Sequence, residues 1–404
     1  MRSVGAAGLG SVLVSAEAIA GPSEPNVEAK EQEAEILQVP KRKLGKTGLK
    51  VPCLALGTMF NIVDNQLTLR STLKYGVSYW DTANVYAGGN SELGIGKLLE
   101  KNPEIRKDVF IATKAQGAFT KEAMEKCLQL SLDRMKTDYV DLHYLHSMQD
   151  PAVLTDEIRK YAESAKKRKL IRFFGFTTHM NMAKCLAAGA KLDWIDVVMT
   201  VHNFRSMQDA EFQDALDACH EANFGLVAMK TTGKTTIKRF KQPIETEADK
   251  KMTEHFLQRG FTPEQACIKL ALQDKRFASA CVQMETVNIL KTNVAAVLDK
   301  TELTQADMDV FREYAEATCS SYCAGCAHIC ESALPNVPYV SDIMRYLMYY
   351  NSYGEKEMAR ELFAEIPRNV RDKLLSTNHS RAEARCPQHL PIGELVAEAV
   401  HKLA

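Results

Sequence analysis

Four cysteines fall within twelve residues near the end of the 404-residue chain, in the run CSSYCAGCAHIC at residues 319–330. A later cysteine, Cys386, is followed at once by Pro387. Three cysteines spaced Cys-x2-Cys-x3-Cys, together with a distant Cys-Pro, are close to the ligand pattern of a [4Fe–4S] cluster. The spacing therefore predicts one iron–sulfur cluster, with the ligands Cys323, Cys326, Cys330 and Cys386.

The cysteine run departs from the bacterial ferredoxin motif in two places. The ferredoxin motif has its first cysteine where this chain has Ser320, and it has proline where this chain has Glu331. The run is therefore half of such a motif, sufficient for one cluster, with Cys319 as a spare or substitute ligand. Four thiolates would also satisfy a structural zinc ion, and thiols without a metal are the third interpretation.

Ionisable residues also close three consecutive strand candidates. Asp81 lies at the end of SYWDTA, Lys114 ends DVFIATK and His146 ends YVDLHYLH, while Tyr86 follows shortly after the first of these runs. A single lysine at a strand end can simply extend its ammonium group to solvent. Three consecutive strands of this kind, with a tyrosine nearby, indicate a functional site at the carboxyl ends of the strands.

The hydrophobic pattern from about residue 50 predicts the elements that would position these residues. Eight short apolar or β-branched runs alternate with longer amphipathic stretches, at residues 53–59, 78–83, 108–114, 139–146, 171–178, 195–201, 224–230 and 277–284. Strands separated by helices imply parallel pairing. Eight repeats over about 250 residues fit a (β/α)₈ TIM barrel better than a doubly wound sheet. The preceding residues 41–51 carry turn glycines and are expected to form a hairpin across the barrel floor.

Several of these runs together resemble one known family. WDTANVYAGGNSELGIGKLL, FIATK and LDRMKTDYVDLHYLH, in this order, resemble the aldo/keto reductases, as does the opening LGKTGLKVPCLALGTM. The resemblance covers roughly residues 41–300 and implies a barrel that reduces carbonyl groups with NADPH. It makes Tyr86 the proton donor, makes Lys114 and Asp81 its charged partners, and has His146 orient the carbonyl. His143 is also near this strand end, but the family pattern ends on the later histidine.

Elementary acid–base chemistry agrees with these roles. Hydride delivery to a carbonyl leaves an alkoxide that needs a proton, and a free tyrosine, with a pKa of about 10, is a weak acid. A nearby Lys114 ammonium favours the phenolate, so it is expected to make Tyr86 a readier donor. Asp81 would keep the lysine charged, and a neutral His146 can hydrogen-bond the substrate oxygen.

The resemblance also implies a nicotinamide cofactor, held after the later strands. Met199 stands where the family usually has glutamine, and Met229 stands where many members have an aromatic ring. Glu285 would repel a 2′-phosphate and suits a ribose hydroxyl, whereas Lys291 and the basic run at residues 234–241 could compensate. Both NADP(H) and NAD(H) therefore stay open. The expected cofactor-binding residues are Thr177, Asn203, Lys230, Glu285 and Asn293.

The two ends of the chain suggest further functions. Residues 301–404 are expected to form a helical tail with the cysteine cluster, as in a bacterial branch of the family with cysteine-bearing tails. Residues 1–20 resemble the latter part of a twin-arginine export signal, although a disordered tail is the alternative, and residues 21–40 form a linker. An exported, periplasmic protein that retains its cofactor is therefore expected, with a cytoplasmic one as the alternative. The cluster could then receive electrons from a transfer partner.

Composition limits the remaining choices. Lys plus Arg (51) equal Asp plus Glu (51), so the charge balance does not favour nucleic acid or an anionic membrane as a partner, and no segment is apolar for long enough to cross a bilayer. The six single cysteines lie among apolar residues and are expected to be buried. The leading interpretation is a reductase of small carbonyl compounds. The alternatives are a non-catalytic redox or binding module and a reductase with a structural zinc site.

Overall fold

The computed structural model describes residues 37–233 and 245–404. The signal-like segment 1–20, residues 21–36 of the linker and the basic run 234–241 lie outside the described residues, so these predictions stay predictions.

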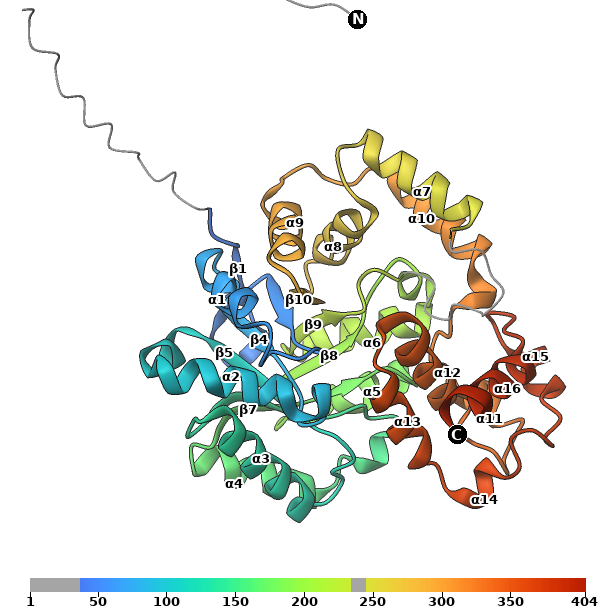
Figure 1. The fold of residues 1–404 in the computed structure, drawn as a ribbon, viewed down its shortest axis with the longest axis horizontal. Coiled ribbons are helices and arrows are strands. Elements are labelled where there is room, and N and C mark those ends of the chain that lie inside the picture. Colours follow the sequence, from blue (N-terminus) through green and yellow to red (C-terminus); the bar gives the residue numbers. More distant parts are fainter. Residues whose placement is uncertain (1–36, 234–244) are drawn as a thin grey trace, which may run out of the picture. The chain divides into compact units, whose positions relative to one another are not determined.

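The described chain contains the predicted (β/α)₈ barrel, seen in the middle of Figure 1. Neighbouring strands pair in parallel all the way round, and β10 closes the circle against β3. The strands are β3 (Leu54–Gly57), β4 (Tyr79–Asp81), β5 (Phe110–Ala115), β6 (Val140–Leu145), β7 (Ile171–Thr178), β8 (Val197–Val201), β9 (Gly225–Met229) and β10 (Phe277–Gln283). Each lies within a run that the sequence predicted, except that β5 extends one residue further, because the strands are largely buried and mostly apolar.

Helices follow the strands and cover the barrel. They are α1 (Gln66–Lys74), α2 (Asn90–Lys101), α3 (Lys121–Met135), α4 (Asp156–Lys167), α5 (Met182–Gly189), α6 (Ala210–Glu221), α7 (Glu247–Gln258), α8 (Pro263–Gln273) and α9 (Val287–Leu298). Threonine side chains cap the amino ends of several of them; Thr120, for example, accepts a hydrogen bond from the Ala123 amide. The main core lies between these helices and the strands.

A hairpin precedes the barrel, as predicted. β1 (Lys41–Lys43) pairs antiparallel with β2 (Lys50–Pro52). The Lys46 amide, in the turn between them, donates to the carbonyl of Asn223 just before β9, and Leu44 is fully buried within the barrel interior. Because β9 begins at this point, the hairpin closes the amino-terminal floor and leaves the carboxyl face for the functional site.

Residues after the barrel form helices only, within the part of the tail that the structure describes. They are α10 (Gln305–Ala317), α11 (Ala327–Glu331), α12 (Val340–Met348), the π-helix η7 (Tyr349–Tyr353), α13 (Lys356–Ala364), α14 (Arg368–Arg371), α15 (Ser380–Arg385) and α16 (Ile392–Leu403). α10 packs against α7, whereas α11 to α16 share a second hydrophobic core. Figure 1 shows α11 to α16, in red, beside α5 and α6, and α10, in orange, beside α7.

Four of the six single cysteines are buried as predicted, and two are only partly buried. Cys53, Cys185, Cys219 and Cys267 are buried, while Cys127 and Cys281 keep some exposure. Over the described residues, no helix is both long and apolar enough to span a membrane.

Candidate functional site

The four residues that close the early strands come together at the carboxyl mouth of the barrel. Asp81 is the last residue of β4, Lys114 lies near the end of β5, His146 directly follows β6, and Tyr86 begins the short helix η2 (Tyr86–Gly89). The Lys114 ammonium forms an ion pair with the Asp81 carboxylate and donates to the Thr82 carbonyl oxygen over 2.7 Å. Its nitrogen lies 3.3 Å from the Tyr86 hydroxyl oxygen.

Burial sets the charges of this group. Asp81 and Lys114 are almost fully buried. Burial alone would lower the pKa of Lys114, but the Asp81 carboxylate outweighs it and raises that pKa above its usual value, so the lysine stays charged. For Tyr86 the balance differs from the sequence-based expectation. Burial raises the pKa of its hydroxyl, and the lowering effect of Lys114 does not overcome it, so Tyr86 holds its proton at neutral pH.

The two histidines of β6 and its end face opposite sides of the barrel wall. His146 lies with its ring 5.9 Å from the Tyr86 ring, centroid to centroid, at the mouth. His143 Nδ1 instead lies 2.6 Å from the Tyr161 hydroxyl on α4, outside the barrel. Burial, with Lys114 and Arg345 nearby, lowers the pKa of His146 well below its usual value. The imidazole at the mouth is therefore neutral, and its N–H can donate a hydrogen bond to a carbonyl oxygen.

Tail residues cover this group, which the sequence did not indicate. A cavity of about 20 Å³ is lined by Tyr86 and His146 from the barrel and by Arg345, Tyr349, Met358 and Leu362 from the tail. That volume holds about one water molecule, whereas ligand pockets usually reach several hundred Å³. In this arrangement, the tail therefore closes the space directly above Tyr86.

Two expected cofactor-binding residues use their side chains within the protein. The Thr177 hydroxyl accepts a hydrogen bond from the Ser147 amide over 2.8 Å. The Asn203 amide nitrogen donates to the Lys230 carbonyl oxygen over 3.0 Å and lies 3.4 Å from the tail hydroxyl of Tyr322. Both side chains are fully buried. Recognition of a nicotinamide carboxamide by Asn203 would require its bonds to change, whereas the Thr177 hydroxyl still has its own proton to donate.

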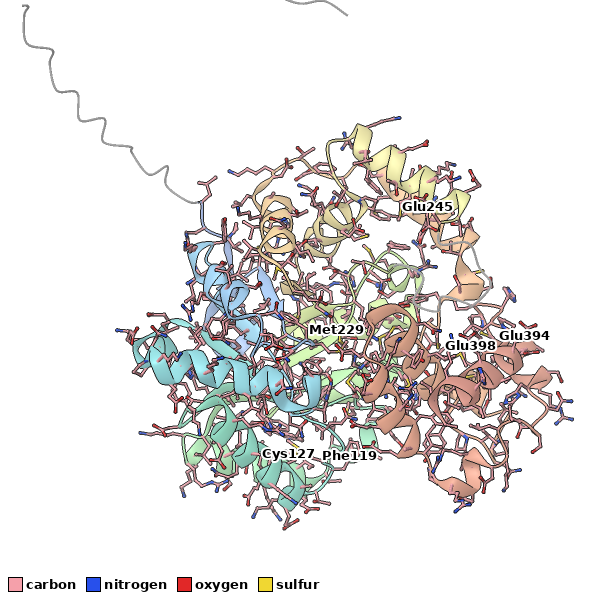
Figure 2. The ribbon with its side chains drawn as sticks, in the orientation of Figure 1. Phe119, Cys127, Met229, Glu245, Glu394 and Glu398 are labelled. Carbon is pink, nitrogen blue, oxygen red and sulfur yellow. The ribbon has the colours of Figure 1, made fainter. Side chains whose placement is uncertain are left out.

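Lys230 follows the last residue of β9, Met229, which Figure 2 labels near the centre of the barrel. The Lys230 ammonium lies 3.8 Å from the Met348 sulfur and 5.8 Å from the Tyr349 ring centroid, both in the tail. Burial and then the Arg345 guanidinium lower the pKa of Lys230 to about 7. The Lys230 amine beneath the tail can therefore gain or lose its proton near neutral pH.

Glu285 lies between β10 and α9, and Asn293 lies within α9. Glu285 is exposed, and its carboxylate accepts a hydrogen bond from the Gln283 amide over 2.5 Å. The Asn293 amide nitrogen is buried and has no partner among the described residues. Their roles in nucleotide binding stay predictions.

The four predicted cluster ligands meet in the tail. Cys323, Cys326, Cys330 and Cys386 all line one small cavity, and Cys319 does not. Yet within residues 37–233 and 245–404, no three histidine, cysteine or acidic side chains are placed so that they could hold a single metal ion. Burial, together with the neighbouring thiols, raises the pKa of Cys326 to about 12. The four thiols are thus gathered around a space but do not converge on one point.

The loop that carries these cysteines is held against the barrel. The Gly325 carbonyl accepts from the Asn181 amide over 2.8 Å, and the Asn181 side chain accepts from the His328 amide over 3.0 Å. Gly325 has φ +77°, and a Cβ atom there would lie 2.2 Å from the His179 carbonyl oxygen. Only glycine allows this close approach. Cys323 also lines a second small cavity with Lys230 and His179, so it lies between the thiol cavity and the barrel mouth.

Comparisons with known proteins extend over the barrel. A model of the Aldo/keto reductase family matches residues 54–316, which end just before the cysteine run. The chain is 26% identical over 291 residues to an L-galactose dehydrogenase of Arabidopsis thaliana, which covers 66% of this chain and 90% of that protein.

Solved structures agree in fold. An aldo-keto reductase of Bacillus halodurans, in its holo form, has a TM-score of 0.56 and 22% identity, and covers 69% of this chain and 96% of that one. A thermostable aldo-keto reductase bound to the inhibitor epalrestat has a TM-score of 0.56 and 23% identity, and covers 68% of this chain and 100% of that one. At these identities the likeness concerns the fold.

Proposed function

The chain belongs to the aldo/keto reductase family, and we propose that it reduces the carbonyl group of a small molecule with NAD(P)H as the hydride donor. Members of this family are oxidoreductases that use NAD(P)H. The observation that carries the proposal is the buried ion pair of Lys114 with Asp81, placed 3.3 Å from the Tyr86 hydroxyl and beside the neutral His146. A carboxylate, an ammonium, a phenol and an imidazole together form an acid–base set suited to protonating an alkoxide.

Each residue of this set has one task. When bound, the nicotinamide supplies a hydride to the substrate's carbonyl carbon. The His146 N–H donates a hydrogen bond to the carbonyl oxygen and holds this oxygen toward Tyr86. Tyr86, which keeps its proton at neutral pH, gives it to the alkoxide, a far stronger base than a phenolate. The Lys114 ammonium then stabilises the phenolate, and Asp81 keeps the lysine charged and in position.

Asp81, Tyr86, Lys114 and His146 suit a nicotinamide-dependent reductase, but the cavity above them is too small for the nicotinamide ring. The cavity of about 20 Å³ is closed by Arg345, Tyr349, Met358 and Leu362, all of which belong to the tail. The barrel side chains could therefore stay in place while the tail is displaced. Lys230, which follows β9, would then face the cofactor, and so would Glu285, which follows β10, and Asn293 on α9.

This arrangement predicts that cofactor binding loosens the tail. Saturating NADPH should raise the amide hydrogen exchange of residues 340–353 and leave that of β4 to β6 unchanged or slower, because the ring must take the volume that α12 and η7 now fill. Exchange followed by mass spectrometry on the full chain measures both regions in one sample. Slower exchange over residues 340–353 would show that NADPH binds beneath a closed tail.

The choice between NADP(H) and NAD(H) depends on Glu285. The exposed carboxylate would repel a 2′-phosphate, so Glu285→Arg should tighten NADPH relative to NADH by roughly 5- to 10-fold. Titration of both nucleotides against the protein's fluorescence gives the ratio of dissociation constants. Glu100→Arg, an equal charge reversal at the exposed end of α2, serves as the control. An unchanged ratio in Glu285→Arg would mean that Glu285 does not face the nucleotide.

A [4Fe–4S] cluster in the tail is the second part of the proposal. The support is that the four predicted ligands line a common cavity. In such a cluster each thiolate binds a different iron, so the sulfur atoms need not converge on one point as they must around zinc. The shared cavity supports a common site for the four thiols, and the iron, zinc and acid-labile sulfide content of the purified protein distinguishes the cluster from the zinc alternative.

An electron-transfer partner is proposed for the cluster. Cys326, Ala324, Gly325 and Pro387 from the thiol loops line a groove of about 1000 Å³ against α5 and α6. Cys323 reaches the barrel mouth from the same loop, and the cluster would thus lie between the groove and the reductase site. If the protein is exported to the periplasm, such a partner would re-reduce the bound cofactor there.

Turnover by the full chain tests the proposal. The anaerobically purified protein is mixed with NADPH or NADH and a panel of aldehydes, ketones, oxo acids and sugars, the sugars being included because a relative is an L-galactose dehydrogenase. Nucleotide oxidation that depends on the carbonyl compound is expected. Nucleotide binding without oxidation, across the whole panel, would favour the alternative of a non-catalytic binding module.

A further inference from the structure

Arg345 brings an incompletely paired positive charge to the reductase site. It lies on α12, is 8% exposed, and lines the same small cavity as Tyr86 and His146. Its Nη2 donates to the Asp342 carboxylate over 2.8 Å. Nε and Nη1 are buried and have no acceptor anywhere in residues 37–233 and 245–404. Three of the five N–H donors of this guanidinium therefore lack a well-placed acceptor among the described residues, with the Tyr346 side chain as a further polar neighbour, and such a deficit is costly for a buried charged group.

The surroundings of Arg345 increase the positive potential at the mouth. The Lys114 and Lys230 ammonium groups lie near enough to interact electrostatically with this region. Together with burial and Arg345, they lower the pKa of the nearby histidines, Lys114 that of His146 and both lysines that of His179. On the acidic side, Asp342 is shared with the Gln149 amide, which donates to the same carboxylate oxygen over 3.0 Å, and Asp81 is paired with Lys114. The net charge next to the cavity is therefore positive, its other polar neighbours such as Gln116, Ser147 and Tyr349 are neutral, and an anionic group bound there would be stabilised.

We propose that Arg345 is a specificity residue that binds the carboxylate of the substrate, and that the preferred substrates are small 2-oxo acids. The inference rests on the proposed carbonyl reduction, and it adds the substrate class. All three side chains line one small cavity, so an outward shift of the tail that widens this cavity would let a carboxylate next to the carbonyl reach Arg345 while the carbonyl oxygen faces Tyr86 and His146. The carboxylate takes no part in bond making. The carbonyl gains a hydride at carbon and the Tyr86 proton at oxygen, which yields a 2-hydroxy acid.

The side chains that line the cavity suit a compact acid, and the closed cavity of about 20 Å³ must widen to admit one. Apart from the polar groups, the cavity is lined by apolar side chains, among them Met59, Val85 and Leu362. Arginine is suited to carboxylate recognition because its planar guanidinium presents several donors to the two oxygens. The phosphate groups of the cofactor are also anions, and they are the alternative ligand for Arg345.

A matched pair of substrates distinguishes these two ligands. Pyruvate and its methyl ester differ in the charge next to the carbonyl, so the ratio of their kcat/KM values reports on carboxylate recognition. For the wild type we expect pyruvate to be preferred. Arg345→Gln should lower that preference about 10- to 100-fold, mainly through the KM for pyruvate, with the ester rate retained. Arg345→Lys should recover part of it. Arg381→Gln, an exposed arginine of the same tail, is the control and should change neither rate.

A binding measurement makes the result independent of turnover. Calorimetric titration of pyruvate into the Tyr86→Phe protein, with and without Arg345→Gln, shows whether Arg345 holds the acid. If no carbonyl is reduced but pyruvate binding still depends on Arg345, the proposed reduction fails and the carboxylate site stands. Equal rates and equal binding for pyruvate and its ester in the wild type would overturn the inference. So would an unchanged acid-to-ester ratio in Arg345→Gln accompanied by weaker NADPH binding, which would assign the guanidinium to the cofactor phosphates.

Discussion

Tyr86→Phe should lower kcat/KM for every carbonyl compound that the protein reduces by about 10²- to 10⁴-fold. The variant loses only the hydroxyl, which lies 3.3 Å from the Lys114 ammonium and would be the source of the proton for the alkoxide. The ring remains to pack against His146, so the dissociation constant for NADPH should stay within about twofold. Steady-state kinetics and a nucleotide titration on the same preparation measure both quantities.

Tyr161→Phe is the matched control for this prediction. It removes a buried tyrosine hydroxyl that contacts His143 behind the barrel wall, away from the mouth. Activity per folded molecule should therefore be retained. Rates like those of the wild type in Tyr86→Phe would remove this tyrosine from the proton-donor role and would leave the neutral His146 as the next acid to test.

The second large effect is expected in the tail, where Cys386→Ser should remove the iron. Cys386 is buried in the hydrophobic core of the tail, and it closes a loop of more than fifty residues back to Cys330. A metal site that closes so long a loop is formed together with the fold around it, so its loss should also loosen residues 331–404. Iron and acid-labile sulfide content, with amide exchange of the tail, measure the two consequences.

Cys319→Ser is the control, because Cys319 does not line the cavity of the other four thiols, and this variant should keep its iron. The barrel should remain folded in both variants, since the main core lies between its own strands and helices. Full iron content in Cys386→Ser would contradict the ligand assignment. Zinc without acid-labile sulfide in the wild type would contradict the cluster itself, and the proposed electron partner would then have no entry point.

Together these predictions describe a reductase whose site is shared by two parts of the chain. The barrel supplies the acid–base set, and the tail supplies Arg345 and Tyr349 above it. The thiol loop touches the same region through Cys323. A change at the cysteines can therefore reach the mouth through α12, which shares the tail's core with Cys386.

The acid–base set was predictable from the sequence because its positions follow local rules. Parallel strands end at one edge, so residues that close β4, β5 and β6 must lie together there. His146 was chosen over His143 because the family pattern ends on the later histidine, and the structure agrees with strand alternation, since residues three apart along a strand point to opposite faces. Local spacing likewise predicted Cys323, Cys326 and Cys330, which line one cavity, whereas the fourth thiol there, Cys386, was chosen for the distant Cys-Pro of the cluster pattern.

Other properties depended on the tertiary structure. The pKa of Tyr86 is raised by burial under the tail, although the nearby lysine alone suggested the opposite. The side chains of Thr177 and Asn203 have the predicted chemistry, but their hydrogen bonds go to Ser147, Lys230 and Tyr322. Arg345 reaches Tyr86 across more than 250 residues of sequence. The physical reason is range: strand periodicity and ligand spacing are set by neighbouring residues, whereas burial, cavity volume and hydrogen-bond pairing are set by segments that meet only when the chain has folded.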